Sequence, residues 1–312
     1  MPYRGRVNAP GPGTLVPRSA VLAVWFPLLA PDGVVDDGAL AACLARVQGD
    51  DEPHTVAWSP GERATPGAVG APHRRGEPDD AVGLGVLLRG WAPRLRSVSA
   101  LFPVAGDVSG VPAAVSAPAV DAEECVLVTL EPVPGADPGQ DAAPGRGADG
   151  SSAWALVPET TPFGSALEQG HLVRWSAVPV PPWERGVLAA VGDLREAERH
   201  LRAVLIGQTE ALDALDVTSW TRSTTEVLSG LAGYRALADL VPDDLAGPRA
   251  RALSESARLR YVVETAVHDE GGAVTLWQTG ARSAALRQVD EAARHAMAAA
   301  TFVAQRPAST DS

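Results

Sequence analysis

The chain has 312 residues, of which 46% are hydrophobic, and this is enough for one large core or two ordinary ones. Its formal net charge of −12 excludes nucleic acid and anionic membrane as main partners, because both require a basic surface. It contains no run of about 18 unbroken apolar residues, which a membrane-spanning helix needs, and its first residues do not form a secretory signal. We therefore expect a cytoplasmic protein.

All 26 basic residues are arginines, so the chain contains no lysine. This excludes chemistry that depends on an amine side chain, such as the phosphate-loop lysine or the Schiff base of pyridoxal phosphate enzymes. The two cysteines, Cys43 and Cys125, lie far apart and form neither a disulfide framework nor a zinc-binding pattern. We expect both to be buried free thiols.

A glycine-rich segment, Gly145 to Gly150, matches the dinucleotide-binding pattern Gly-x-Gly-x-x-Gly letter by letter. That pattern binds a pyrophosphate only where a strand leads into it and a helix follows, so that backbone amides and the helix dipole meet the phosphates. Here a low-complexity run precedes the glycines and no helical pattern follows them. We therefore expect no cofactor.

The first 180 residues predict a short arm and then a sheet-containing domain. Residues 1–18 are rich in proline and glycine, so we expect a flexible arm. Apolar residues at helical spacing predict two helices, one starting at Asp36 or Asp37 and one at Asp79 or Asp80. Short apolar runs predict strands at 19–26, 54–58, 95–104, 125–130, 154–157 and 171–178. Residues 19–180 should therefore form an α/β or α+β domain with about five to six strands.

Three segments rich in proline or glycine should interrupt this order. Residues 131–152 lack large apolar side chains beyond Val133, and we expect a disordered insert there. A turn containing Pro158 and Pro162 is expected between the last two strands. Three prolines within 177–183 disfavour helix and most sheet pairing, so this segment should join the sheet domain to the next one.

Residues 183–304 carry helix signals almost without interruption, and residues 305–312 form a short tail. A capping box at Ser223 to Glu226 and a proline at position 248 mark two of the helix starts. Because the connections are short, we expect an all-α antiparallel four-helix domain. The predicted helices are 183–216, 223–241, 248–269 and a last helix from 273 or 274 to 304.

Three predicted helices carry a glutamate four residues ahead of a histidine. The pairs are Glu196 with His200, Glu264 with His268, and Glu291 with His295. Helical bundles hold carboxylate-bridged metals with inward glutamates and histidines, so a metal centre has to be considered. At about 100° per residue, however, the first and last pairs point away from the apolar stripe of their helices. We therefore interpret them as solvated ion pairs and expect no metal ligands.

The segment Gly106-Asp107-Val108-Ser109-Gly110 is the one candidate ligand loop. It follows a predicted strand, and ligands in open α/β sheets settle beyond the carboxyl ends of strands. The alternative is a structural turn in which Asp107 and Ser109 bond to their own backbone. If the loop serves a ligand, Asp107→Ala should leave the melting temperature nearly unchanged.

This loop occurs together with the runs 271–274, 284–287 and 292–296, which read Gly-Gly-Ala-Val, Ala-Ala-Leu-Arg and Ala-Ala-Arg-His-Ala. In these features the chain resembles an uncharacterised family of two-domain cytoplasmic proteins from actinobacteria, over about residues 19–304. The resemblance implies a lineage but no activity, so it transfers no catalytic residue.

Two hypotheses about function follow. Since no nucleophile with a base and no zinc-protease or hydrolase motif occurs, the first is a non-catalytic protein that uses the helical bundle for protein contacts. The second is an enzyme or small-molecule sensor, with Asp107 as acid, base or ligand contact and Ser109 as hydrogen-bond donor. A histidine or tryptophan that converges on Asp107 from another segment would favour the enzyme or sensor. A flat apolar strip on the helical bundle would favour the protein that makes protein contacts.

Overall fold

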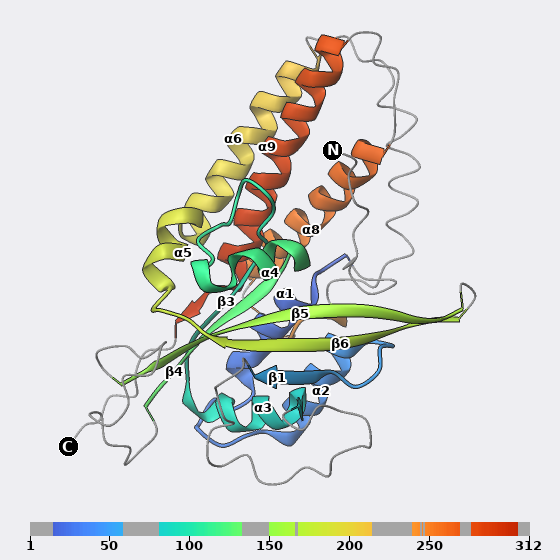
Figure 1. Cartoon of the computed structure of the whole chain (residues 1–312). Helices are drawn as coiled ribbons and strands as arrows, with labels where there is room; N and C mark the ends of the chain where they lie inside the picture. The colour runs from blue at the N-terminus through green and yellow to red at the C-terminus, as the bar shows by residue number, and fades with distance from the viewer. Residues whose placement is uncertain are drawn as a thin grey trace, which may run out of the picture.

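The computed structural model describes residues 15–58, 81–132, 150–165, 168–213, 239–243, 245, 247–268 and 276–304 (Figure 1). Several predictions fall outside these residues. They are most of the flexible arm, residues 133–149 of the disordered insert, nearly all of the helix at 223–241, and the tail.

Six strands from the N-terminal part of the chain and a seventh at residues 303–304 form a mixed sheet, which has one strand more than the upper estimate from the sequence. Its order is β2-β1-β6-β5-β4-β3-β7, and only β1 and β6 pair in parallel. The strands are β1 (Thr55–Trp58), β2 (Val82–Gly83), β3 (Leu95–Leu101), β4 (Cys125–Leu130), β5 (Ser152–Ser165), β6 (Glu168–Pro179) and β7 (Val303–Ala304). The added edge strands β2 and β7 have two residues each, too few to give a periodic pattern in the sequence.

Strands β5 and β6 form one long ribbon where the sequence predicted two short strands and an intervening turn. They pair without interruption from Trp154 with Pro179 to Ser165 with Glu168. Figure 1 shows the ribbon projecting beyond the other strands. Pro158 was taken as a turn residue, but its ring and missing N–H are tolerated because β4 pairs with β5 only up to Leu156. The proline therefore lies on a free edge of β5.

The predicted strand at 19–26 is instead the helix α1 (Arg18–Trp25). Arg18 and the six residues after it are buried, so the run shows no polar face that would mark helical spacing. No side chain next to the helix caps its N-terminus. The backbone amide of Ser19 donates instead to the Glu124 carboxylate across 2.8 Å. A partner about a hundred residues away thus satisfies an amide that the first turn leaves free.

Three further helices accompany α1: α2 (Asp37–Gln48), α3 (Leu84–Trp91) and α4 (Ser116–Ala122). The prediction for α2 is confirmed, because the Asp36 side chain accepts hydrogen bonds from the amides of Gly38 and Ala39 at 2.7 and 3.1 Å. Helix α3 begins later than predicted, since Val82 and Gly83 pair with β1.

The rear part consists of α5 (Glu184–Val191), α6 (Leu194–Asp213), α8 (Gly247–His268) and α9 (Leu276–Thr301). One uninterrupted helix was predicted at 183–216, but the chain breaks at Gly192, whose φ is +77°. A capping box then starts α6: the Glu196 amide donates to Asp193, and the Asp193 amide donates to Glu196. Glu196 therefore serves this cap rather than the ion pair with His200 that the sequence suggested.

Helix α9 packs against both α6 and α8 (Figure 1). The described residues thus contain three long helices, which differs in detail from the predicted four-helix bundle. The carboxyl end of α9 enters the main core with the sheet, where Met297 and Ala298 pack in the same apolar cluster as Val98. Thr301 also accepts a hydrogen bond from the Ala100 amide at 2.9 Å. The last helix is therefore bonded directly to the backbone of β3.

Within the described ranges, no helix is both long enough and apolar enough to cross a membrane.

Candidate functional site

The loop that follows β3 is a tight turn in which three residues, Gly106, Ser109 and Gly110, have positive φ. Val104 and Asp107 exchange backbone hydrogen bonds of 2.9 and 3.0 Å, and Gly106 at the turn has a φ of +96°. Ser109 has a φ of +51°, which is uncommon for a residue with a side chain. Oδ1 of Asp107 accepts from the Ser109 amide at 3.0 Å. The self-bonding turn proposed from the sequence is therefore present.

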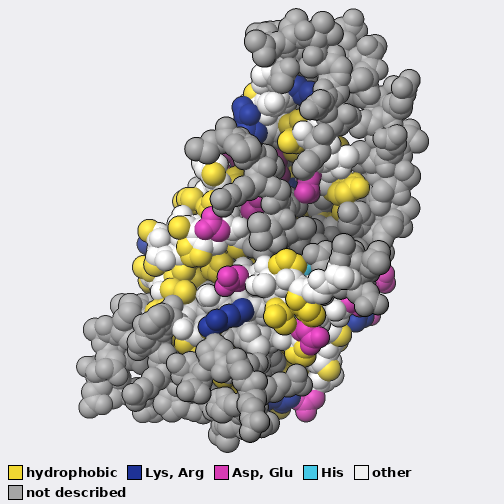
Figure 2. All heavy atoms as spheres, turned by 45° about the vertical axis from the view of Figure 1, so that its right-hand side comes forward, with side chains coloured by type: hydrophobic (Ala, Val, Ile, Leu, Met, Phe, Trp, Pro, Cys, Tyr) yellow, Lys and Arg dark blue, Asp and Glu magenta, His cyan; other side chains and the backbone are white. Residues whose placement is uncertain are grey.

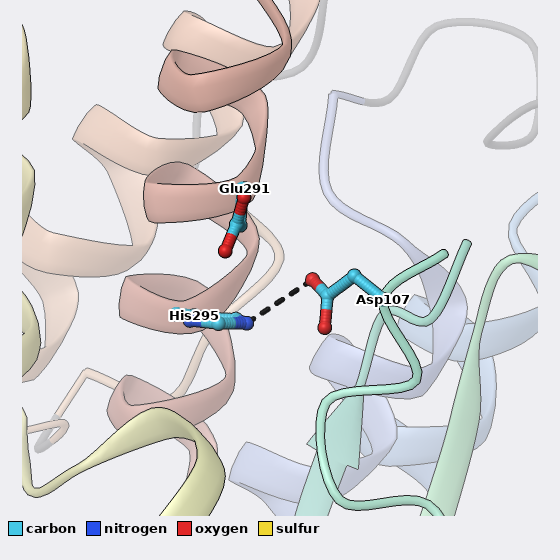
Figure 3. Close-up of side chains that lie close together, drawn as sticks. All are labelled: Asp107, Glu291 and His295. Carbon is cyan, nitrogen blue, oxygen red and sulfur yellow. Dashed lines mark hydrogen bonds and ion pairs between the residues drawn. The ribbon is translucent and has the colours of Figure 1, made fainter. Parts of the chain in front are cut away.

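The same carboxylate also reaches helix α9. Oδ2 of Asp107 lies 2.7 Å from Nη1 of Arg294 and 3.1 Å from Nε2 of His295. Figure 3 shows Asp107 approaching His295 from the loop, with Glu291 one turn away on the helix. The loop and the last long helix therefore meet at a single carboxylate.

A network of ion pairs from α8 and α9 holds the contact between Asp107 and Arg294 in place. The guanidinium of Arg294 is only 3% exposed, and it also donates to Asp290 at 2.8 Å and to the Phe102 carbonyl at 2.9 Å. Asp290 lies 3.5 Å from Arg260 on α8. Burial alone would raise the pKa of Asp107, but the hydrogen bond from His295 and the charge of Arg294 hold it well below its ordinary value. Asp107 is therefore an ionised carboxylate at neutral pH.

The prediction that Glu291 and His295 both face water is wrong for the histidine. Glu291 is exposed, but the His295 side chain is only 14% exposed. The prediction assumed that α9 has one buried face, whereas the loop after β3 covers another part of the helix. Nothing in the sequence of α9 indicates this second covering element. Arg294, the residue that binds Asp107 most closely, was missed for the same reason.

Gly110, the last residue of the predicted ligand loop, has a packing role. Its φ is +82°, and a Cβ at this position would lie 3.0 Å from the Gly186 carbonyl oxygen on α5. Helix α5 is fixed in turn by Glu184, whose Oε1 accepts from Ser97 and Thr129 at 2.6 Å each. The loop is therefore held between α5 and α9, whereas a Cβ at Gly106 would meet nothing within 4 Å.

The arrangement does not match a serine hydrolase. In a catalytic triad the histidine lies between the serine and the acid, where it can take the proton from the serine. Here Asp107 occupies the middle, with the Ser109 hydroxyl 3.3 Å from Oδ1 and His295 on Oδ2. Ser109 is also buried. An ionised, centrally placed carboxylate can attract a cation, but it cannot donate a proton as a general acid.

Comparison with known families decides the relationship. The model of the Rv1486c-like protein N-terminal domain matches residues 19–188, and that of the C-terminal domain matches residues 195–298. The chain belongs to the Rv1486c-like protein family. Comparison with curated proteins and with solved structures gave no match.

The two family domains each supply part of the site in this Rv1486c-like chain. Asp107 comes from the segment that matches the N-terminal domain, and Glu291 and His295 come from the segment that matches the C-terminal domain. The contact between Asp107 and His295 therefore joins the two domains.

A second polar cluster lies within the N-terminal part of this Rv1486c-like protein. Oδ2 of Asp51 lies 2.6 Å from Arg18 and 3.6 Å from Nε2 of His54, and Oδ1 lies 3.3 Å from Nδ1 of His171. Trp175 donates to Nδ1 of His54 at 3.2 Å, so neutral His54 carries its proton on Nε2, facing Asp51. Burial lowers the pKa of His54. Both ring nitrogens of His54 therefore face protein groups, and the cluster links α1 to β6 through Asp51.

Proposed function

We propose that this protein is a non-catalytic, ligand-binding sensor whose site lies where the loop 104–110 meets α9. The supporting observation is the convergence of His295 on Asp107, because the two residues come from segments almost 190 positions apart. Binding between them would hold the N-terminal and C-terminal domains together. The residues predicted from the sequence then have two different roles. Asp107 faces the ligand, whereas Ser109 and Gly110 shape the loop.

Three features support binding rather than catalysis. Asp107 is ionised and cannot serve as a general acid. Ser109 is buried and has its hydroxyl directed to Asp107 rather than to His295. The two thiols, Cys43 and Cys125, are fully buried, and burial raises the pKa of Cys43 to about 12, so Cys43 is not a nucleophile.

A protein contact through the helical part stays a second proposal. It is supported by exposed apolar side chains on the helices, with Ile206 of α6 63% exposed and Val267 of α8 46% exposed. Figure 2 shows the hydrophobic side chains of the visible face in separate groups with charged side chains between them. Dispersed apolar residues are normal on a protein surface. These exposed side chains therefore support a protein contact less strongly than the convergence at Asp107 supports ligand binding.

A thermal-shift panel tests the proposed function. The full chain is melted with divalent metal ions, polyamines, amino acids and nucleotides, each at high concentration. A ligand that binds the folded state at about 100 times its Kd adds about 2.7 kcal/mol of stability, which raises the Tm of a protein of this size by about 5 °C. We expect at least one class of compound to produce such a rise.

The control is His295→Gln, which keeps a polar side chain on α9 but removes the imidazole. The stabilising compound should lose most of its effect on this variant, and it should keep its effect on His200→Gln, where the histidine is exposed on α6. The proposal fails if no compound stabilises the wild type, or if the rise in Tm is the same in His295→Gln.

A further inference from the structure

Three potential metal ligands lie close together at the junction. Within the described part of the chain, ligand atoms of Asp107, Glu291 and His295 come within 4.8 Å of one another. The 3.1 Å between Oδ2 of Asp107 and Nε2 of His295 equals the spacing of two donors on one ion, about 3.0–3.4 Å for bonds of about 2.1 Å. Two of the three ligand atoms are therefore already spaced as two donors bound to the same ion would be.

Glu291 is placed to complete the set. It precedes His295 by four residues on α9, so the two side chains share one face of the helix. Its side chain is exposed, and it makes no hydrogen bond or ion pair with any residue that the structure describes. A rotation about its side-chain bonds can bring a carboxylate oxygen toward the other two ligands without breaking an existing contact.

The local charge favours a cation. Asp107, Asp290 and Glu291 carry three negative charges, and Arg260 and Arg294 carry two positive ones. One negative charge of this group is therefore uncompensated. Arg294 could oppose a metal ion, but it is held by Asp290 and the Phe102 carbonyl as well as by Asp107. It can stay in place and orient the Asp107 carboxylate, as residues behind metal ligands commonly do.

We propose that the ligand of this site is a first-row divalent transition-metal ion, bound by Asp107, Glu291 and His295. One imidazole nitrogen and two carboxylates suit ions such as Zn²⁺, Co²⁺ and Mn²⁺, whereas Mg²⁺ and Ca²⁺ prefer all-oxygen ligands. Because the ligands come from both domains, the ion bridges them. This inference rests on the proposed function and names its ligand class.

Titration of the tag-free full chain with Zn²⁺ tests the inference. The protein is first freed of metal with a chelator, and binding is then followed by calorimetry at neutral pH. One ion should bind per chain, and Glu291→Gln and His295→Gln should each weaken binding at least about tenfold, because each loses one of three ligands. Co²⁺ should give visible absorption bands that both variants lose, whereas Mg²⁺ should not compete.

Matched controls separate this site from adventitious surface binding. Glu255 on α8 and His200 on α6 are exposed, so Glu255→Gln and His200→Gln should leave Zn²⁺ affinity unchanged. Thermal unfolding of all four variants without metal checks that each is folded. Because Glu291 is exposed, Glu291→Gln should fold like the wild type even if His295→Gln does not.

The inference is overturned if the wild type binds no Zn²⁺, or if Glu291→Gln and His295→Gln bind it as tightly as the wild type. This result is distinguishable from failure of the proposed function. If another compound of the thermal-shift panel stabilises the wild type but not His295→Gln, the binding site stands and only its ligand class is wrong. If neither Zn²⁺ nor any other compound acts through His295, both proposals fail.

Discussion

The two carboxylate oxygens of Asp107 have different main partners, one set within the loop and one on α9. Oδ1 accepts from the Ser109 amide and shapes the loop, while Oδ2 faces Arg294 and His295 on α9. These contacts change the expectation for Asp107→Ala. The sequence suggested a nearly unchanged melting temperature if the loop serves a ligand, but alanine removes the turn bond and leaves a buried guanidinium short of a partner. That substitution cannot separate the two roles.

Asp107→Asn tests the role of the charge. An amide can accept at only one of the two positions, so Arg294 or Ser109 loses its acceptor, and we expect a loss of about 2 kcal/mol at neutral pH. The pKa of Asp107 is depressed in the folded state, so its contribution is present above the unfolded pKa of about 3.9 and is lost as the pH falls through the lower folded value.

Urea unfolding of wild type and Asp107→Asn from pH 7 to pH 2 measures this effect. The difference in unfolding free energy should shrink as the pH falls below about 4. A difference that does not change over this range would show that the charge of Asp107 contributes nothing to the junction.

At the scale of elements, the loop 104–110 is positioned by its two neighbours. Asp107 binds α9, and Gly110 lies against the backbone of α5. The contact with α5 leaves no room for a side chain, because a Cβ on Gly110 would lie 3.0 Å from both the Gly186 carbonyl oxygen and the Cα of Val187. Backbone atoms cannot move aside as the end of a side chain can.

Gly110→Ala and Gly106→Ala make a matched pair. Both glycines have positive φ, so both alanines cost about 1–2 kcal/mol for the left-handed conformation. Only Gly110 also meets backbone, whereas a Cβ on Gly106 meets nothing within 4 Å. We expect Gly110→Ala to lose about 2–4 kcal/mol in urea unfolding and Gly106→Ala clearly less. Equal losses would mean that α5 does not constrain the loop.

The sequence predicted elements best where local signals decide. The Asp36 cap identified α2, and the β-branched run of β4 identified that strand. Helix α1 was mistaken for a strand because it is buried on nearly all sides and its N-terminal amide is satisfied by Glu124 from a distant segment. For the candidate site, the position of the loop after a predicted strand led to Asp107, and its role in binding stays a prediction. His295 was missed because its cover on α9 comes from a loop that the helix sequence does not encode.

At the scale of the whole molecule, the two family domains share an apolar core and a polar junction. The main core includes Leu253 of α8 and Met297 of α9 together with residues of the sheet. Strand β7, directly after α9, pairs with β3. Figure 1 shows the long helices α6, α8 and α9 extending away from the sheet. A ligand at Asp107 and His295 would bind next to the point where α9 emerges from this core.

Hydrogen exchange with and without the strongest stabiliser of the thermal-shift panel, which we expect to be Zn²⁺, tests the junction most directly. Ligand binding should slow exchange of the amides in 104–110 and around 290–297 together, because one ligand ties both segments. The effect should disappear in His295→Gln. Unchanged exchange in these two segments, or equal protection in wild type and His295→Gln, would contradict the binding site proposed here.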